Sequence, residues 1–154
     1  MAKLDLSLSD AELYEFLAER RTVRLATSGP DGLPHVVPLW YVWFDGTMFM
    51  NSTLGNVTVR NLKSNPRGAG IVDDGETYEE LRGVLLHGTV EPADEDVRLV
   101  QVADLWSRKY MGGGPLPYGN WRNRVWLRLV PDRVKSWDFS KIPEAKAGAR
   151  AVDG

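Results

Sequence analysis

The chain has 154 residues, no cysteine and a formal net charge of −2. These values exclude disulfides, cysteine-ligated metal and thiol catalysis, and they argue against a nucleic-acid-binding protein, which usually carries a basic excess. Hydrophobic residues make up 43% of the chain and charged residues 26%, as in a globular domain, and no apolar run is long enough to span a membrane. The N-terminal segment "MAKLDLSLSD" carries acids where a secretory signal is apolar, so we expect a cytoplasmic protein.

The first predicted element is a helix that starts near residue 10. Ser9 followed by Glu12 is a capping-box pattern, which satisfies the free amides at the start of a helix. Leu13, Phe16 and Leu17 then fall on one face. This helix is expected to lie against a sheet.

Three strands are predicted next, at about residues 22–28, 34–44 and 47–52. Their content of β-branched and aromatic residues favours extended structure. The turn signals "GPDG" and "FDGT" separate them. Turns this short join antiparallel neighbours, so the strands form hairpins.

The second half adds a helix at about 57–64, two strands in "GAGIVDDG" and "YEELRGVLLHGTVEPAD", and a helix from about Glu95 to Tyr110. A Gly/Pro loop, "MGGGPLPYGN", precedes closing strands in "RVWLRLVPDRVKSWDF". The buried stripe of the 95–110 helix is predicted to contain Val97, Val100, Leu105 and Trp106.

This pattern predicts a mainly β (α+β) fold in a single domain, residues 1–141, followed by a flexible tail at 142–154. Six or seven strands with so few helices do not suit a doubly wound parallel sheet. A small antiparallel barrel with peripheral helices fits better.

From about Ser9 to Lys141 the chain resembles the pyridoxamine 5′-phosphate oxidase-like, FMN-binding split-barrel superfamily. The resemblance rests on four segments in order: "RLATSGPDGLPHVVPLWYVWFDG", "TLGNVTVRNLKSNPR", "DDGETYEELRGVLLHGTVE" and "VPDRVKSWDFSK". The last segment and the "ETYEELRGV" strand look most like the actinobacterial branch, where many members use coenzyme F420 and others bind FMN, haem or no known cofactor. The resemblance implies a homodimer with two cofactor sites at its interface, and hydride transfer between the cofactor and a small-molecule substrate.

The resemblance also assigns cofactor contacts to three segments. One strand would lie along the ring system, a second would meet the ribityl chain or phosphate, and a third would edge the ring. The residues at these positions are Pro38, Leu39, Trp40 and Tyr41 on the first, Asn51, Ser52 and Thr53 on the second, and Arg82 and Gly83 on the third.

The loop after "LG" departs from the family pattern. In flavin-binding relatives basic side chains there grip the phosphate, whereas this chain has Asn56, Val57 and Thr58. Helix amides and neutral side chains still offer donors, but a lost charge-assisted contact costs about 1.5–3 kcal/mol. We therefore expect F420 to bind more tightly than FMN. The alternative is that Ser52, Thr53 and Asn56 only cap the helix.

Between Leu105 and Pro131 the chain carries five cations, no acid and a glycine-rich loop, interleaved with aromatic residues. We expect Lys109, Arg122 and Arg124 to contact the anionic tail of F420, and the loop to close over the site. The alternative is a solvated basic face, with the tryptophans in the core or at a dimer contact.

The remaining candidates are weaker. Arg82 has Glu79 and Glu80 nearby, so an ordinary ion pair is the alternative to a ring contact. His35 and His87 are the possible axial ligands of a haem, but they have no spacing typical of a metal site.

No catalytic triad or carboxylate pair is indicated, and a proton donor could be Tyr41, Tyr110 or Tyr118. The leading hypothesis is an F420- or FMN-dependent oxidoreductase. The alternatives are a haem or flavin carrier or sensor on the same fold, and a dimeric module without a cofactor.

Overall fold

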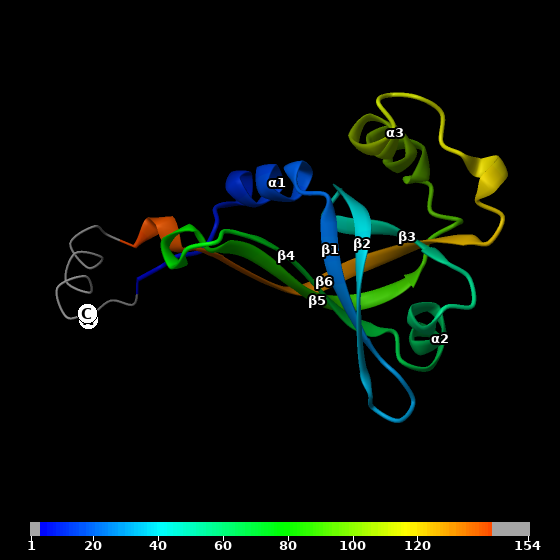
Figure 1. Cartoon of the computed structure of the whole chain (residues 1–154), viewed down its shortest axis with the longest axis horizontal. Coiled ribbons are helices and arrows are strands. Elements are labelled where there is room, and N and C mark those ends of the chain that lie inside the picture. The colour runs from blue at the N-terminus through cyan, green and yellow to red at the C-terminus, as the bar shows by residue number, and fades with distance from the viewer. Residues whose placement is uncertain (1–3, 143–154) are drawn as a thin grey trace.

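The computed structural model describes residues 4–142, in which six antiparallel strands close into a barrel (Figure 1). The order around the barrel is β1-β2-β3-β6-β5-β4. The predicted mainly β barrel is thus confirmed, while all of the predicted tail except residue 142 lies outside the described residues. The strands are β1 (Thr22–Ser28), β2 (Pro34–Phe44), β3 (Thr47–Thr53), β4 (Arg67–Asp74), β5 (Arg82–Pro92) and β6 (Arg124–Asp138).

Three α-helices of the described chain lie outside the barrel (Figure 1): α1 (Asp10–Glu19), α2 (Val57–Ser64) and α3 (Leu99–Tyr110). The predicted capping box of α1 is present, because Ser9 Oγ accepts from the Glu12 amide and Glu12 Oε1 from the Ser9 amide. Phe16 and Leu17 bury the inner face of α1 as expected. The Tyr41 hydroxyl donates to the Leu17 carbonyl at 2.6 Å and ties α1 to β2.

Hairpin β2–β3 turns through two residues in the left-handed region. Asp45 has φ 52° and Gly46 has φ 65°, the combination that matches the right-handed twist of the flanking strands. The "FDGT" segment therefore forms the predicted turn. The barrel interior is then filled by alternate side chains that are at most 1% exposed, among them Leu25, Met48, Leu86 and Leu129.

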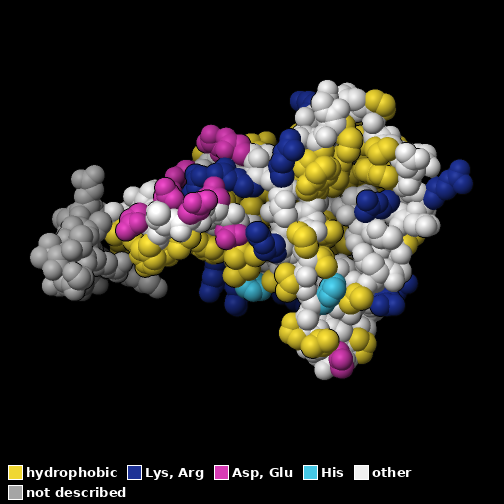
Figure 2. Space-filling model, in the orientation of Figure 1, with side chains coloured by type: hydrophobic (Ala, Val, Ile, Leu, Met, Phe, Trp, Pro, Cys, Tyr) yellow, Lys and Arg dark blue, Asp and Glu magenta, His cyan; other side chains and the backbone are white. Residues whose placement is uncertain are grey.

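Helix α3 begins at Leu99, four residues later than predicted, and its buried stripe differs from the prediction. Trp106 is buried as expected, and Val102 is fully buried, but Val97 and Val100 are 86% and 79% exposed. Val97 lies in the turn before the helix, and Val100 lies on the side of the helix opposite Val102, which faces the barrel together with Trp106 one turn further on. Figure 2 shows apolar side chains gathered around α3, with Lys and Arg side chains beside them.

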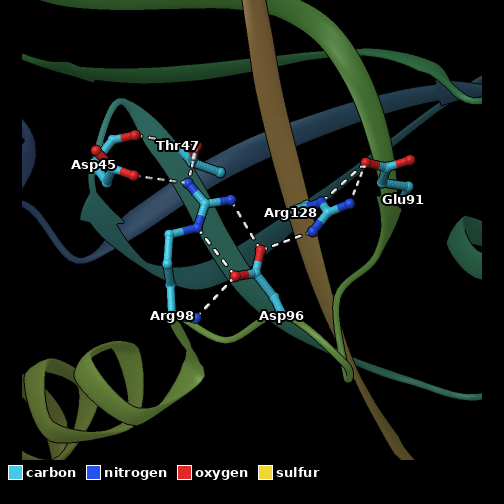
Figure 3. A network of polar contacts seen from close by, with 6 residues as sticks. All are labelled: Asp45, Thr47, Glu91, Asp96, Arg98 and Arg128. Atoms are coloured by element: carbon cyan, nitrogen blue, oxygen red, sulfur yellow. Dashed lines mark hydrogen bonds and ion pairs between the residues drawn. The ribbon is translucent and has the colours of Figure 1, made fainter.

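The turn before α3 is held by a network around Asp96 (Figure 3). The Asp96 carboxylate accepts from Arg98 Nε at 3.0 Å, Arg98 Nη2 at 2.9 Å and Arg128 Nη1 at 2.7 Å. Arg98 also reaches Asp45, and Arg128 also reaches Glu91. The hydrogen bonds from Arg98 and then Arg128 hold the pKa of the Asp96 carboxyl well below its usual range. The network therefore fixes the start of α3 against β5, β6 and the β2–β3 turn.

Candidate functional site

An aromatic groove lies between the barrel wall and α3. Its volume is about 360 Å³, and we call it the aromatic groove throughout. Strands β2 and β3, helix α3, the segment after it and the start of β6 supply the lining residues: Pro38, Leu39, Trp40, Asn51, Trp106, Met111, Trp121 and Arg124. Four of the predicted cofactor-contacting residues on β2 and β3, Pro38, Leu39, Trp40 and Asn51, thus meet at one surface.

The groove is built on a cluster of packed rings. Trp40 stacks on Tyr110 with centroids 4.4 Å apart and planes 6° from parallel. Trp106 contacts Tyr110 at 4.8 Å and meets Trp126 edge to face at 5.2 Å. Edge-to-face and offset stacks are the arrangements that aromatic rings prefer, and together they give the groove an apolar wall. Such a surface suits a flat, conjugated ligand.

The second feature of the groove is the Asn51 side chain. Asn51 is 7% exposed, yet neither Oδ1 nor Nδ2 has a hydrogen-bond partner among the described residues. The Trp106 indole N–H, in the same groove, also lacks one. An unsatisfied buried polar group costs about 1–3 kcal/mol, and such groups occur preferentially at functional sites. The wall of the groove thus contains buried polar atoms whose hydrogen-bonding capacity is unused in the described chain.

A polar groove adjoins the aromatic one. It has a volume of about 420 Å³ and is lined by Thr53, Gly119, Asn120, Arg122, Asn123 and Arg124. Arg124 borders both grooves, and its guanidinium lies 6.0 Å from the Trp121 ring. Arg122 forms no ion pair within residues 4–142. The two arginines therefore leave positive charge at one end of the aromatic groove.

The loop at the start of α2 caps the helix. Asn56 Oδ1 accepts from the Val59 amide at 2.9 Å, and Asn56 Nδ2 donates to Ser52 Oγ at 2.9 Å. Asn56 therefore caps the helix, as the alternative interpretation expects, and Ser52 supports Asn56 by accepting a hydrogen bond from its side chain. Val57 is 39% exposed, whereas Thr58 is 1% exposed and its hydroxyl has no partner in the described chain. A basic side chain fits the surface at position 57 but not at position 58.

Arg82 and Gly83 lie away from the groove. Arg82 pairs with Asp74 at 3.1 Å, not with Glu79 or Glu80, and its guanidinium lies 5.0 Å from the Phe16 ring. In the sheet, Arg82 is opposite Asp138, at the far end of β6 from Arg124 (Figure 1). Within one chain, Arg82 and Gly83 therefore do not line the groove that the predicted contacts on β2 and β3 form.

The packing of a neighbouring ring explains why position 83 is a glycine. A Cβ atom at this position would lie 2.4 Å from Cζ2 of Trp137, its partner on β6. A side chain at this position would force the Trp137 ring to move, so the neighbouring ring favours glycine independently of any ligand.

The predicted basic cluster separates into several environments. Lys109 faces a different pocket, between α1 and α3. Arg108 pairs with Asp104, and Arg128 pairs with Asp96 and Glu91. The structure therefore brings Arg122 and Arg124 together but does not bring Lys109 to them.

The three predicted proton donors differ in their surroundings. The Tyr41 hydroxyl donates to the Leu17 carbonyl, and the Tyr110 hydroxyl lies within 2.6 Å of the Tyr41 carbonyl. Burial raises the pKa of both phenols well above its usual value. Both hydroxyls contact backbone carbonyls, and their raised pKa makes them poor proton donors. Tyr118, by contrast, is 56% exposed to solvent.

Neither predicted haem ligand lines the aromatic groove. His35 lies in β2 opposite Thr27, and His87 lies in β5 opposite Ala69. In the part of the chain that the structure describes, no group of three or more His, Asp or Glu side chains could hold a metal ion. Residues 4–142 also contain no helix that is long and apolar enough to cross a membrane.

Sequence reasoning missed Met111 as a groove residue, because it follows the last residue of α3 and has no pattern that marks it. It also missed the Asp96 network, since the acid and its partner Arg128 are distant in the chain.

Comparison with known proteins finds one matching family model and solved structures with a similar fold. The model for the pyridoxamine 5′-phosphate oxidase family matches residues 9–138. A search of curated proteins gives no match. Among solved structures, the conserved hypothetical protein Rv2991 from Mycobacterium tuberculosis is 33% identical with a TM-score of 0.79, and the alignment covers 92% of each chain.

Two further structures bear on the site. An F420 reductase is 26% identical with a TM-score of 0.59, over 79% of this chain and 95% of that one. HutZ, the haem storage protein from Vibrio cholerae, is 21% identical with a TM-score of 0.66, over 83% and 94% of the two chains, and shows the fold alone. Because the family model spans nearly all of the described barrel, the chain belongs to the pyridoxamine 5′-phosphate oxidase family.

Proposed function

We propose that this protein is an oxidoreductase that transfers a hydride between a (deaza)flavin cofactor, F420 in preference to FMN, and a small-molecule substrate. The observation that carries the proposal is the buried, unpartnered Asn51 amide in a groove walled by tryptophans. A flavin-type ring has a flat conjugated surface and alternating donors and acceptors along its edge. That chemistry matches both features of the groove.

The residues have distinct roles in this proposal. Trp40 and Trp106 supply flat apolar surface and exclude water. Asn51 orients the ligand through its amide, and Arg122 and Arg124 meet its anionic part. When bound, the cofactor supplies the redox chemistry, while the protein positions it.

The preference for F420 rests on charge. Position 57 carries a valine and position 58 a buried threonine, so neither supplies a cation to a phosphate at the start of α2. The cations near the groove are instead Arg122 and Arg124. A ligand with an extended anionic tail can use that second groove, and FMN is shorter. The fold is also shared with an F420 reductase and with a FAD-binding protein from Mesorhizobium loti.

We also propose a homodimer. Trp40, Leu54 and Val57 are 46%, 51% and 39% exposed, which leaves apolar surface on and near the groove. A partner covering this face would seclude the ring from water. Light scattering at micromolar concentration tests the proposal, and a stable monomer contradicts it.

The main experiment titrates the protein with F420 and with FMN and compares it with Asn51→Leu. Leucine is similar in size and removes both amide atoms, so F420 affinity should fall about 5- to 150-fold, the equivalent of 1–3 kcal/mol. The melting temperature should stay equal or rise, because an unpartnered buried amide is removed. If Asn51 has only a structural role, Asn51→Leu should leave F420 affinity unchanged and lower the melting temperature. Gln101→Leu, on the exposed side of α3, is the control.

A second variant tests the cofactor preference. Val57→Arg restores one family cation at an exposed position and should strengthen FMN binding by about 1.5–3 kcal/mol. If the unmodified protein binds FMN at nanomolar strength and not F420, the charge argument is wrong. If it binds neither, the oxidoreductase proposal fails.

A further inference from the structure

A second pocket, separate from the aromatic groove, lies between α1, β2 and α3. Its volume is about 270 Å³. Tyr14 and Ala18 of α1 and Val42 and Trp43 of β2 give it apolar walls. None of these residues lines the aromatic groove. The size suits a ligand of one or two rings.

The polar end of this pocket is the Lys109 ammonium. Lys109 Nζ lies 4.2 Å from the Tyr41 ring centroid, and its one hydrogen bond within residues 4–142, to the Leu17 carbonyl, is long at 3.5 Å. No carboxylate of the described chain forms an ion pair with it. The neighbouring cations are Arg21, which donates to the Lys109 carbonyl oxygen at 2.9 Å, and Arg108, which already pairs with Asp104. A half-buried amine among cations, without a counter-charge, is costly to the fold.

We propose that this pocket binds a small apolar carboxylate, with its carboxylate group paired to the Lys109 ammonium and its hydrocarbon part against Val42 and Trp43. The carboxylate supplies the acceptor that the three N–H donors of the amine lack. The apolar walls then select ligands with a hydrophobic body over small inorganic anions.

Binding at this pocket is coupled to proton uptake. Burial, and then repulsion by Arg21, lowers the pKa of Lys109 to about 8 in the free protein. A bound carboxylate favours the charged amine and raises that pKa, so the complex takes up protons near pH 8, and affinity falls as the pH rises above 8. Tyr41 and Tyr110, also near the amine, keep their protons in this range because burial raises their pKa. Tyr14 is the remaining titratable side chain of the lining.

The probe is 2-naphthoate, measured by calorimetry at pH 8 in two buffers of different ionisation enthalpy. Naphthoate should bind with uptake of a fraction of a proton, and the neutral 2-naphthylmethanol should bind at least ten-fold more weakly. Lys109→Met keeps the apolar stem and should cost at least ten-fold in affinity and abolish the proton uptake. Ala18→Leu, at an exposed position of α1, should also weaken binding by filling the pocket.

Two controls separate this site from others. Lys135→Met removes an exposed lysine on β6, and Arg124→Gln alters the aromatic groove; both should leave naphthoate affinity unchanged. Unchanged affinity or unchanged proton uptake in Lys109→Met overturns the proposal. Equal affinities for 2-naphthoate and 2-naphthylmethanol also overturn it. If Arg124→Gln weakens naphthoate binding and Ala18→Leu does not, the probe binds in the aromatic groove and the proposal is wrong.

Discussion

Asp96→Asn is expected to destabilise the protein, because Asp96 is a buried acid that two arginines share. The Asp96 side chain is only 4% exposed and accepts hydrogen bonds from two arginines (Figure 3). Removing one partner of a buried ion pair typically costs 3–5 kcal/mol. Arg98 and Arg128 are 26% and 28% exposed and keep Asp45 and Glu91 as partners, so we expect the lower end, about 3 kcal/mol. For a chain of this size, that lowers the melting temperature by about 6–12 °C.

The matched control is Asp104→Asn, which breaks the exposed pair with Arg108 one helical turn apart on α3. Exposed pairs contribute about 0–1 kcal/mol, so the control should melt within a few degrees of the unmodified protein. Thermal unfolding followed by circular dichroism measures both. Equal losses for the two variants would refute the view that the Asp96 network anchors α3.

The pH dependence gives the same prediction an independent test. The pKa of Asp96 is lowered in the folded protein by hydrogen bonds from Arg98 and Arg128, against about 3.9 in an unfolded chain. A lowered pKa stabilises the fold at pH values above the unfolded pKa, and this stabilisation is lost as the pH falls towards the folded value. The difference in melting temperature between the unmodified protein and Asp96→Asn should therefore be constant from pH 7 to about pH 5 and shrink below about pH 4.

Three further predictions use other parts of the structure. Tyr110→Phe removes a hydroxyl that accepts from the Tyr41 amide and lies 2.7 Å from the Arg21 carbonyl, so the free energy of unfolding should fall by about 1–3 kcal/mol. The same change at the exposed Tyr118 should leave the free energy of unfolding nearly unchanged. Equal losses for the two variants would contradict the anchoring role of Tyr110. Gly88→Ala should destabilise strongly, because the new Cβ would lie 2.1 Å from the Val130 carbonyl oxygen; an unchanged melting temperature would show that the β5–β6 bulge can open. The double change of Arg122 and Arg124 to Ala should weaken long-tailed F420 more than a form without glutamates, and less so at high salt; equal losses would mean that the arginines do not contact the tail.

The parts of the fold that were predicted correctly are set by nearby residues. The Ser9–Glu12 cap, the Asp45–Gly46 turn and the helix at 57–64 each depend on side chains within a few positions of one another. The rest of the barrel followed from the number of strands and the shortness of the turns. Local chemistry decides these features, so a single sequence contains enough information to predict them.

The errors come from contacts between distant segments. The start of α3 was misplaced because Arg128, 32 residues beyond Asp96, holds the preceding turn in place, and no local pattern shows that pairing. Arg82 was expected to edge the cofactor ring, with an ion pair to Glu79 or Glu80 as the alternative, yet the register of β4 against β5 brings Asp74 directly opposite. In the Arg82 case the strand register decides which acid meets the arginine, and in the Asp96 case only the folded chain brings the turn to Arg128 on β6; composition provides neither arrangement.

The separation of the predicted basic cluster also has a geometric reason. On α3, Leu105 and Lys109 are one turn apart and face α1, while Trp106 is rotated by about 100° and faces the aromatic groove. One helix thus forms a wall of two different pockets. Its ends are held by Asp96 and by the Tyr110 hydroxyl, neither of which lines either pocket. Because neither anchor lines a pocket, Lys109→Met changes one lining without removing an anchor of the helix, and Asn51→Leu changes the other lining from β3, outside the helix.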